Sequence, residues 1–199
     1  MSKMLSTEEN LTQINKFCEE AEEAISSDVF LNKLGGLTIF AGVVDFLCIQ
    51  AARSVEQCVI KYDIANKRKY SFDEGAPHED NWFYDRRIST RSIIKNIRKW
   101  SSSITSHEDI KKHVFDMCES GEEFLNNRNT AIHHVGNPRV SIEKMNESVT
   151  DAITEYKKFL KVFFLFQEKI RPFTFSEDER KLLYGDDKSK GVILNVAHL

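Results

Sequence analysis

Residues that interrupt regular secondary structure are scarce in this sequence. Its 199 residues include only 8 glycines and 3 prolines. A fold rich in β-strands needs many tight turns, and glycine and proline are among the residues that most often form them. Their scarcity leaves room for long helices, and apolar residues recur at helical spacing over most of the chain. We therefore expect an all-α fold, an antiparallel helical bundle of four to five main helices.

Four long helical segments and one short one can be placed from these patterns. Their limits follow from capping residues, from a glycine pair and from proline. The last long segment has the clearest pattern, a continuous apolar stripe. The expected helices cover residues 6–27, opened by a Ser6–Glu9 capping box; about 37–67, after Gly35-Gly36; about 88–100; about 106–132, opened by Ser106; and 141–170, closed by Pro172.

The length of the chain fits one domain with a sizeable core. We expect a helical bundle over residues 1–175, with a connection at 68–86 that packs onto it. A C-terminal tail, residues 176–199, follows with a short helix at about 177–184. Residues 192–199 are compatible with either a docked strand or disorder.

Composition excludes several classes of protein. Hydrophobic residues make up 41% and charged residues 30%, as in globular rather than disordered proteins. The net charge of -3 creates no general attraction for nucleic acid, so such a surface would have to be local. The four cysteines are scattered without a CxxC pair, so they predict reduced thiols within helices. We expect no metal site and no cofactor.

The N-terminal sequence lacks the apolar core of a signal peptide. The most apolar stretch, Leu37–Ala52, is interrupted by Asp45 and Gln50 and is short for a bilayer span. A cytoplasmic protein with no membrane partner is therefore expected.

One charged residue lies where an apolar residue is expected. At about 100° per residue, Arg128 falls within the apolar arc of the third long helix. An unpaired buried charge is costly, so Arg128 needs a partner, and Asp45 is one candidate for an ordinary structural ion pair. His133 follows near the expected helix end and would lie on a different face of a continuous helix. The two converge if the helix unwinds near Ile132, or if they meet residues of a second copy. The apolar arc comprises Ile110, Val114, Met117, Gly121, Phe124 and Leu125.

Arg128, Asn129 and His133 resemble the R-x(4–6)-H signature of HEPN domains, in which a polar residue often follows the arginine. The setting also matches, because the motif ends a long helix of an all-α bundle and another long helix follows. The resemblance covers residues 37–170, about the whole bundle core. It implies a homodimer whose two motifs face each other, and a metal-independent endoribonuclease of host defence or of a toxin–antitoxin system.

The residue types suit this chemistry. Cleavage of RNA without metal needs a base for the 2′-hydroxyl, an acid for the leaving 5′-oxygen and positive charge at the phosphate. Histidine can serve as base or acid near neutral pH, and the planar fork of Arg128 can bind two phosphate oxygens. Asn129 could orient His133 or the phosphate, since they lie one helical turn apart. The resemblance implies products with a 2′,3′-cyclic phosphate and a 5′-hydroxyl.

Two departures from the family pattern bear on this interpretation. His134 follows His133 directly, and both fit the permitted spacing, so either imidazole could act, although His133 shares a face with Asn129. Some toxin–antitoxin members carry a tyrosine two residues after the histidine, where an antitoxin can modify it. Val135 stands there in this chain, which weakens control by that route.

The short basic segment is the candidate RNA-binding surface. An amphipathic helix with a solvated basic face is the ordinary interpretation of such a pattern. If the motif is active, the same face is suited to the RNA backbone. The residues concerned are Arg87, Arg91, Lys95 and Arg98.

The sequence thus predicts a HEPN-like endoribonuclease with RNA, a second copy of the chain, and an antitoxin or other defence-system protein as partners. The alternative is a catalytically inactive HEPN-like module that binds a partner protein or a nucleotide. A third interpretation is an unrelated structural bundle.

Overall fold

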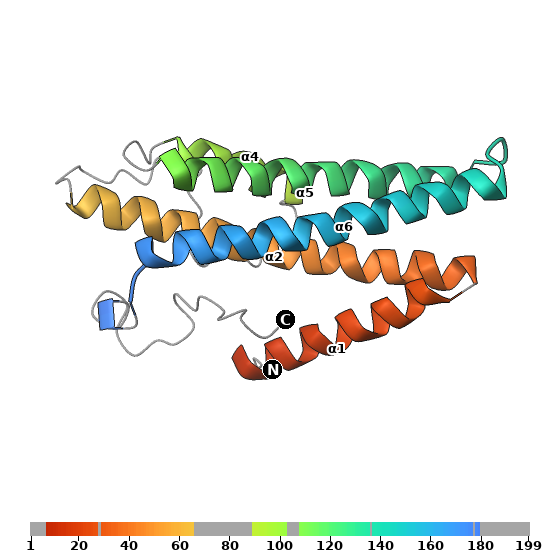
Figure 1. The fold of residues 1–199 in the computed structure, drawn as a ribbon, viewed down its shortest axis with the longest axis horizontal. Helices are drawn as coiled ribbons and strands as arrows, with labels where there is room; N and C mark the ends of the chain where they lie inside the picture. Colours follow the sequence, from red (N-terminus) through yellow and green to blue (C-terminus); the bar gives the residue numbers. More distant parts are fainter. Residues whose placement is uncertain are drawn as a thin grey trace. The chain divides into compact units, whose positions relative to one another are not determined.

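The computed structural model describes residues 7–27, 29–65, 89–102, 108–135, 137–176 and 178–179. These residues form five α-helices packed against each other and contain no strand (Figure 1). The all-α fold class is confirmed. The helices are α1, Thr7–Ser26; α2, Phe30–Ala65; α4, Thr90–Ser101; α5, Glu108–Val135; and α6, Ile142–Ile170, with a 3-10 helix, η1, at Arg171–Phe173.

The chain divides into two compact units. Within the described ranges, the first contains residues up to 46 and residues 119–161, and the second contains residues from 47 to 118 and from 162 onward. Helices α2, α5 and α6 each contribute a segment to both. The expected connection at 68–86, the caps at Ser6 and Ser106, and the tail beyond residue 179 lie outside the described residues.

Tyr156 of α6 lies at the centre of the first unit. It is 2% exposed, and its ring stacks on Phe40 of α2 with ring centroids 3.8 Å apart. Phe124 of α5 packs against the same ring at 6.0 Å, and the Cys18 Sγ of α1 lies 3.9 Å from the phenol oxygen. Burial raises the pKa of the Tyr156 phenol, so it stays protonated. All four helices of this unit therefore meet at one side chain.

The close approach of α1 to α2 explains the glycine at position 36. A Cβ atom on Gly36 would lie 2.7 Å from Ile25 Cγ2 and 2.8 Å from the Ala21 carbonyl oxygen. The prediction that the Gly35-Gly36 pair precedes the helix and that α2 begins at Leu37 is wrong. Gly35 and Gly36 lie inside α2, and Gly36 permits close helix packing rather than a break.

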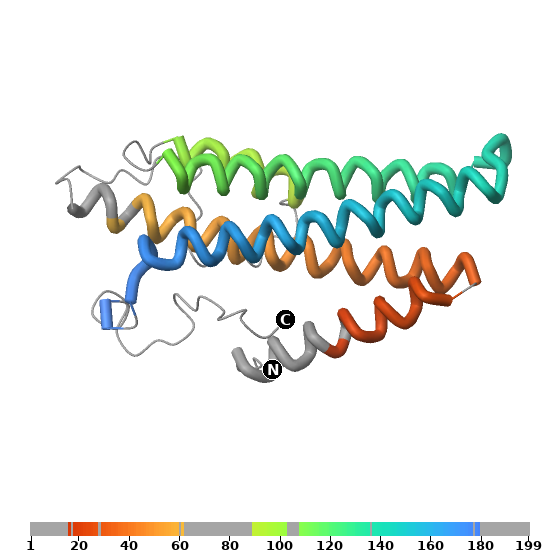
Figure 2. The backbone as a smooth tube through the Cα atoms, viewed as in Figure 1, coloured from red at the N-terminus to blue at the C-terminus, as the bar shows by residue number. Residues whose placement is uncertain are grey.

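Helices α5 and α6 form an antiparallel pair in the first unit. Lys158 of α6 forms an ion pair with Glu123 of α5, and nearer the turn Ser148 of α6 contacts His134 of α5. The predicted start of this helix at Ser141 agrees with the structure, in which Ser141 caps α6 because its Oγ accepts the Lys144 N–H at 3.3 Å. The backbone trace in Figure 2 follows this hairpin and continues from α6 into η1.

The second unit is built on the isoleucines of α4. Ile93, Ile94 and Ile97 are all buried, and the Cys118 thiol of α5 donates to the Ile94 carbonyl at 3.8 Å. Ser89 caps α4, since its side chain accepts the Ser92 N–H. The predicted amphipathic helix is confirmed, with its apolar face in the core.

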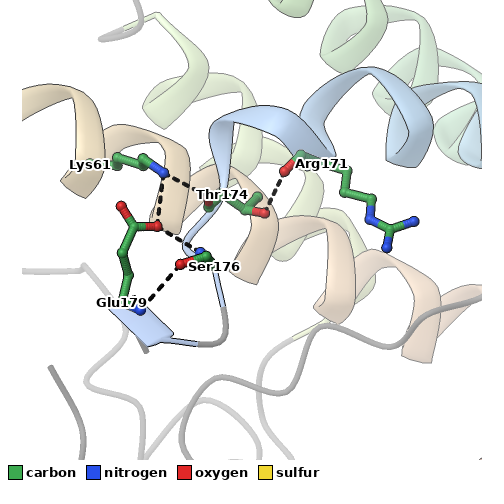
Figure 3. A network of polar contacts seen from close by, with 5 residues as sticks. All are labelled: Lys61, Arg171, Thr174, Ser176 and Glu179. Atoms are coloured by element: carbon green, nitrogen blue, oxygen red, sulfur yellow. Dashed lines mark hydrogen bonds and ion pairs between the residues drawn. The ribbon is translucent and has the colours of Figure 1, made fainter. Parts of the chain in front are cut away.

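A polar network in the second unit joins the segment after α6 to α2 (Figure 3). Lys61 Nζ donates to the Thr174 carbonyl at 3.1 Å and to Glu179 Oε2 at 2.9 Å. The same carboxylate oxygen accepts the Ser176 N–H at 2.7 Å, and the Glu179 N–H donates to Ser176 Oγ at 3.2 Å. These last two bonds form a capping box.

Helix α2 supplies much of the core. Val44, Leu47, Ala51 and Val55 are fully buried. The stretch Phe30–Val59 is longer than the apolar segment considered from sequence, and by length and composition alone it could cross a membrane. Its most apolar window is 56% buried inside the protein. Length and composition thus fit a membrane span and a core helix alike.

The four cysteines are free thiols in helices, as predicted. Cys48, Cys58 and Cys118 are buried, and Cys18 is half-buried. Burial raises the pKa of the Cys58 thiol to about 11, so it remains a protonated, apolar core group.

Candidate functional site

The end of α5, in the first unit, carries the whole candidate motif. Helix α5 continues past the expected end at about Ile132, through both histidines to Val135, and so ends before the sequence Gly136-Asn137-Pro138, as these residues predict. Unwinding near Ile132 therefore does not bring Arg128 and His133 together. On a continuous helix, His133 lies about 140° around the axis from Arg128.

Arg128 is half-buried and held by its neighbour. Its Nη1 donates to Asn129 Oδ1 at 3.1 Å, while its Nε is buried with no hydrogen-bond partner among the described residues. The other candidate partner, Asp45, is exposed rather than buried. Within the described part of the chain, Arg128 forms no ion pair, so the structural Arg128–Asp45 pair is not observed.

The hydrogen bond to Asn129 sets the direction of the guanidinium. Asn129 lies about 100° from Arg128 on the helix, and His133 lies about 40° beyond Asn129. The side chain of Asn129 thus stands between the other two, and its amide oxygen draws the guanidinium toward the side on which His133 projects. Arg128, Asn129 and His133 thus follow one another around about 140° of the last two turns of α5.

The two histidines have different environments. The His133 side chain is exposed. His134 is half-buried, and its Nδ1 lies 2.6 Å from Ser148 Oγ of α6. Adjacent residues project about 100° apart on a helix, so one imidazole faces outward while the other faces α6.

Sequence reasoning did not identify Ser148 as part of this site. Ser148 is 5% exposed and lies within the apolar stripe of α6, between Met145 and Ala152. A small polar residue in an apolar stripe is the signal that could have found it, because a buried hydroxyl needs a hydrogen-bond partner.

The candidate RNA-binding helix, α4, belongs to the second unit. Arg91 and Lys95 are exposed, as expected for a basic face. Arg98 is half-buried with a buried Nε and takes part in further interactions, so it does not lie fully opposite the isoleucines. Arg87 lies outside the described residues.

Among the described residues, no group of three or more histidine, cysteine, aspartate or glutamate side chains is placed to hold a metal ion. No protein-family model, no curated protein and no solved structure matches this chain.

Proposed function

We propose that this protein is a metal-independent endoribonuclease of the HEPN type, with its active site at the end of α5. One observation carries the proposal. Arg128 is half-buried, bonded to Asn129, and has an Nε–H without a partner among the described residues, and the exposed His133 follows on the same helix. Leaving a buried charged donor unpaired costs free energy, so such a site favours an acceptor supplied by a ligand or a partner.

The chemistry assigns a role to each group. The guanidinium of Arg128 binds the scissile phosphate and stabilises the charge that develops on it. His133 transfers the proton, as base toward the 2′-hydroxyl or as acid toward the 5′-oxygen. Asn129 keeps the guanidinium on the histidine side of the helix. The products are a 2′,3′-cyclic phosphate and a 5′-hydroxyl.

The architecture supports this assignment. The motif ends a long helix, α5, and the long helix α6 follows after a short turn. This is the setting that the HEPN resemblance implies, an antiparallel bundle with a core over about residues 37–170.

A homodimer completes the site in this proposal. One chain offers a single arginine and a single outward-facing histidine, whereas the reaction needs charge stabilisation together with both an acid and a base. Two large apolar side chains are exposed in this part of the first unit, Ile132 within the motif at 38% and Ile142 at the start of α6 at 70%. Their burial against a second copy around a two-fold axis would bring both motifs together.

We place the enzyme in the cytoplasm, within a host-defence or toxin–antitoxin system, with an antitoxin or other defence protein as its partner.

The second candidate function is that of an inactive HEPN-like module that binds a nucleotide or a protein. The fixed guanidinium favours it too, because Arg128 and Asn129 could hold a phosphate without cleaving it.

The test is an RNA cleavage assay in excess EDTA with analysis of the product ends. Cleavage should persist and yield 2′,3′-cyclic phosphate and 5′-hydroxyl ends. Loss of activity in EDTA with recovery on adding a divalent metal would contradict the mechanism. Tight binding of RNA or nucleotide without any cleavage would favour the inactive module.

Measurement of RNA binding at several salt concentrations tests α4, our candidate surface for the RNA backbone. Reversal of Arg91 and Lys95 to glutamate should weaken RNA binding and reduce its salt dependence, because phosphate contacts are lost. Reversal of the exposed Lys112 and Lys169 is the matched control. Equal effects of the two reversals would remove α4 from the proposal.

A further inference from the structure

We propose that His134 and Ser148 form a positioning pair that fixes the last turn of α5, so that His133 is the imidazole presented to RNA. This inference rests on the proposed ribonuclease function. It assigns different roles to two adjacent histidines that both fit the spacing of the motif. Its evidence is the two hydrogen bonds of the Ser148 hydroxyl and the place of His134 in the helix.

The hydrogen bonds of Ser148 determine which imidazole nitrogen of His134 carries a proton. The Ser148 hydroxyl donates to the Lys144 carbonyl at 2.9 Å. A hydroxyl has one hydrogen, so toward His134 its oxygen acts as the acceptor. Both bonds form together only when His134 Nδ1, 2.6 Å from Ser148 Oγ, is the donor. The neutral ring is therefore the Nδ1–H tautomer.

His134 is also anchored through its backbone. The last carbonyls of a helix have no N–H partner within the helix. The His134 carbonyl accepts the Asn137 N–H at 3.1 Å, while the side chain bonds to α6. Two bonds, one through the backbone carbonyl of His134 and one through its side chain, thus tie the end of α5 to the turn and to the neighbouring helix.

This anchoring acts on His133 through the backbone. His133 precedes His134 directly, and its own side chain is exposed. A fixed final turn keeps the His133 imidazole near the side of α5 from which Asn129 projects, about 40° away around the helix axis. Misplacement of a catalytic group by about 1 Å can lower the rate by roughly 100-fold. His134 and Ser148 are accordingly positioning residues, whose loss should lower kcat rather than raise KM.

Two substitutions at His134 distinguish positioning from catalysis. Asparagine places an amide near the position of Nδ1, so His134→Asn can still donate to Ser148 but offers no imidazole. Glutamine places its amide near the position of Nε2, so His134→Gln loses the bond. We expect His134→Asn to retain most of kcat. His134→Gln and Ser148→Ala should each lower kcat by about 100-fold with KM unchanged.

Thr150→Ala is the matched control on α6. The Thr150 hydroxyl donates to the carbonyl four residues earlier at 2.9 Å, as the Ser148 hydroxyl does, but it is exposed. This variant should keep full activity. A thermal melt of each variant shows that the protein is folded. A folded His134→Asn as inactive as His133→Ala would make His134 catalytic and overturn the proposal.

Nitrogen NMR of the imidazole rings tests the pair without any RNA. The wild-type His134 should show the Nδ1–H tautomer, and Ser148→Ala should move it toward the Nε2–H form that free imidazole favours. The His133 signals should not change tautomer. An Nε2–H tautomer for His134 in the wild type would overturn the pairing. If the wild type cleaves no RNA while these signals appear as expected, the ribonuclease proposal fails and the pairing stands.

Discussion

At the scale of single residues, Glu179 illustrates how the fold uses an ionised carboxylate. The Ser176 N–H and the Lys61 ammonium both bond to it, and together they lower the pKa of Glu179 from 4.5 to about 2 (Figure 3). The folded state thus binds the proton more weakly than the unfolded state does. The carboxylate stabilises the fold above about pH 4.5, and this contribution is lost as the pH falls toward 2.

Glu179→Gln should therefore be less stable than the wild type at pH 7, and the difference should shrink toward zero near pH 2. The measurement is the free energy of unfolding in urea at both pH values. Glu168→Gln, at an exposed position on α6, serves as the control and should differ little at either pH. A Glu179→Gln protein as stable as the wild type at pH 7 would contradict the role of this network.

The side-chain hydrogen bonds of the candidate site were the feature that the sequence predicted least well. The apolar arc of α5 predicts that Arg128 is drawn toward the interior, and the structure finds it half-buried. Its bond to Asn129 depends on a side-chain rotamer, which spacing does not determine. The bond between His134 and Ser148 depends on how α5 and α6 are offset along each other, which is set by the turn and by core packing.

At the scale of helices, Gly36 and Gly35 offer a direct test of the α1–α2 contact. A Cβ on Gly36 would meet a backbone oxygen and a side chain below 3 Å, whereas a Cβ on Gly35 would meet nothing within 4 Å. Gly36→Ala should destabilise the protein by about 1–3 kcal/mol through overpacking. Gly35→Ala should stabilise it by up to about 1 kcal/mol through helix propensity.

Chemical denaturation of the two variants measures this difference. Both add one methyl group inside the same helix, so the difference between them isolates the packing against α1. Equal stability of the two variants would show that α1 does not approach α2 as closely as described.

Most helix limits followed from local signals. The start of α6 was predictable because Ser141 caps it, and its end because Pro172 follows. The start of α2 was not, since a glycine pair is a common helix break, and here a tertiary contact explains it. The sequence Gly136-Asn137-Pro138 is the local signal for the end of α5, and the helix extends to Val135, a little beyond the expected limit at about Ile132.

At the scale of the whole molecule, the scarcity of helix breakers was enough to predict an all-α fold. The division into two compact units was not predictable, because α2, α5 and α6 each contribute to both and the sequence carries no linker at the division. Function at this scale depends on whether the end of α5 is an active site.

The most direct measurement is the rate of RNA cleavage in EDTA by the wild type, Arg128→Ala and His133→Ala, each shown to be folded by a thermal melt. Loss of proton transfer should lower the rate by about 100- to 10,000-fold in His133→Ala. Arg128→Ala should lose charge stabilisation, and Arg128→Lys should restore it only in part, because an ammonium lacks the planar fork. If the folded Arg128→Ala and His133→Ala proteins cleave RNA as fast as the wild type, the end of α5 is not the active site.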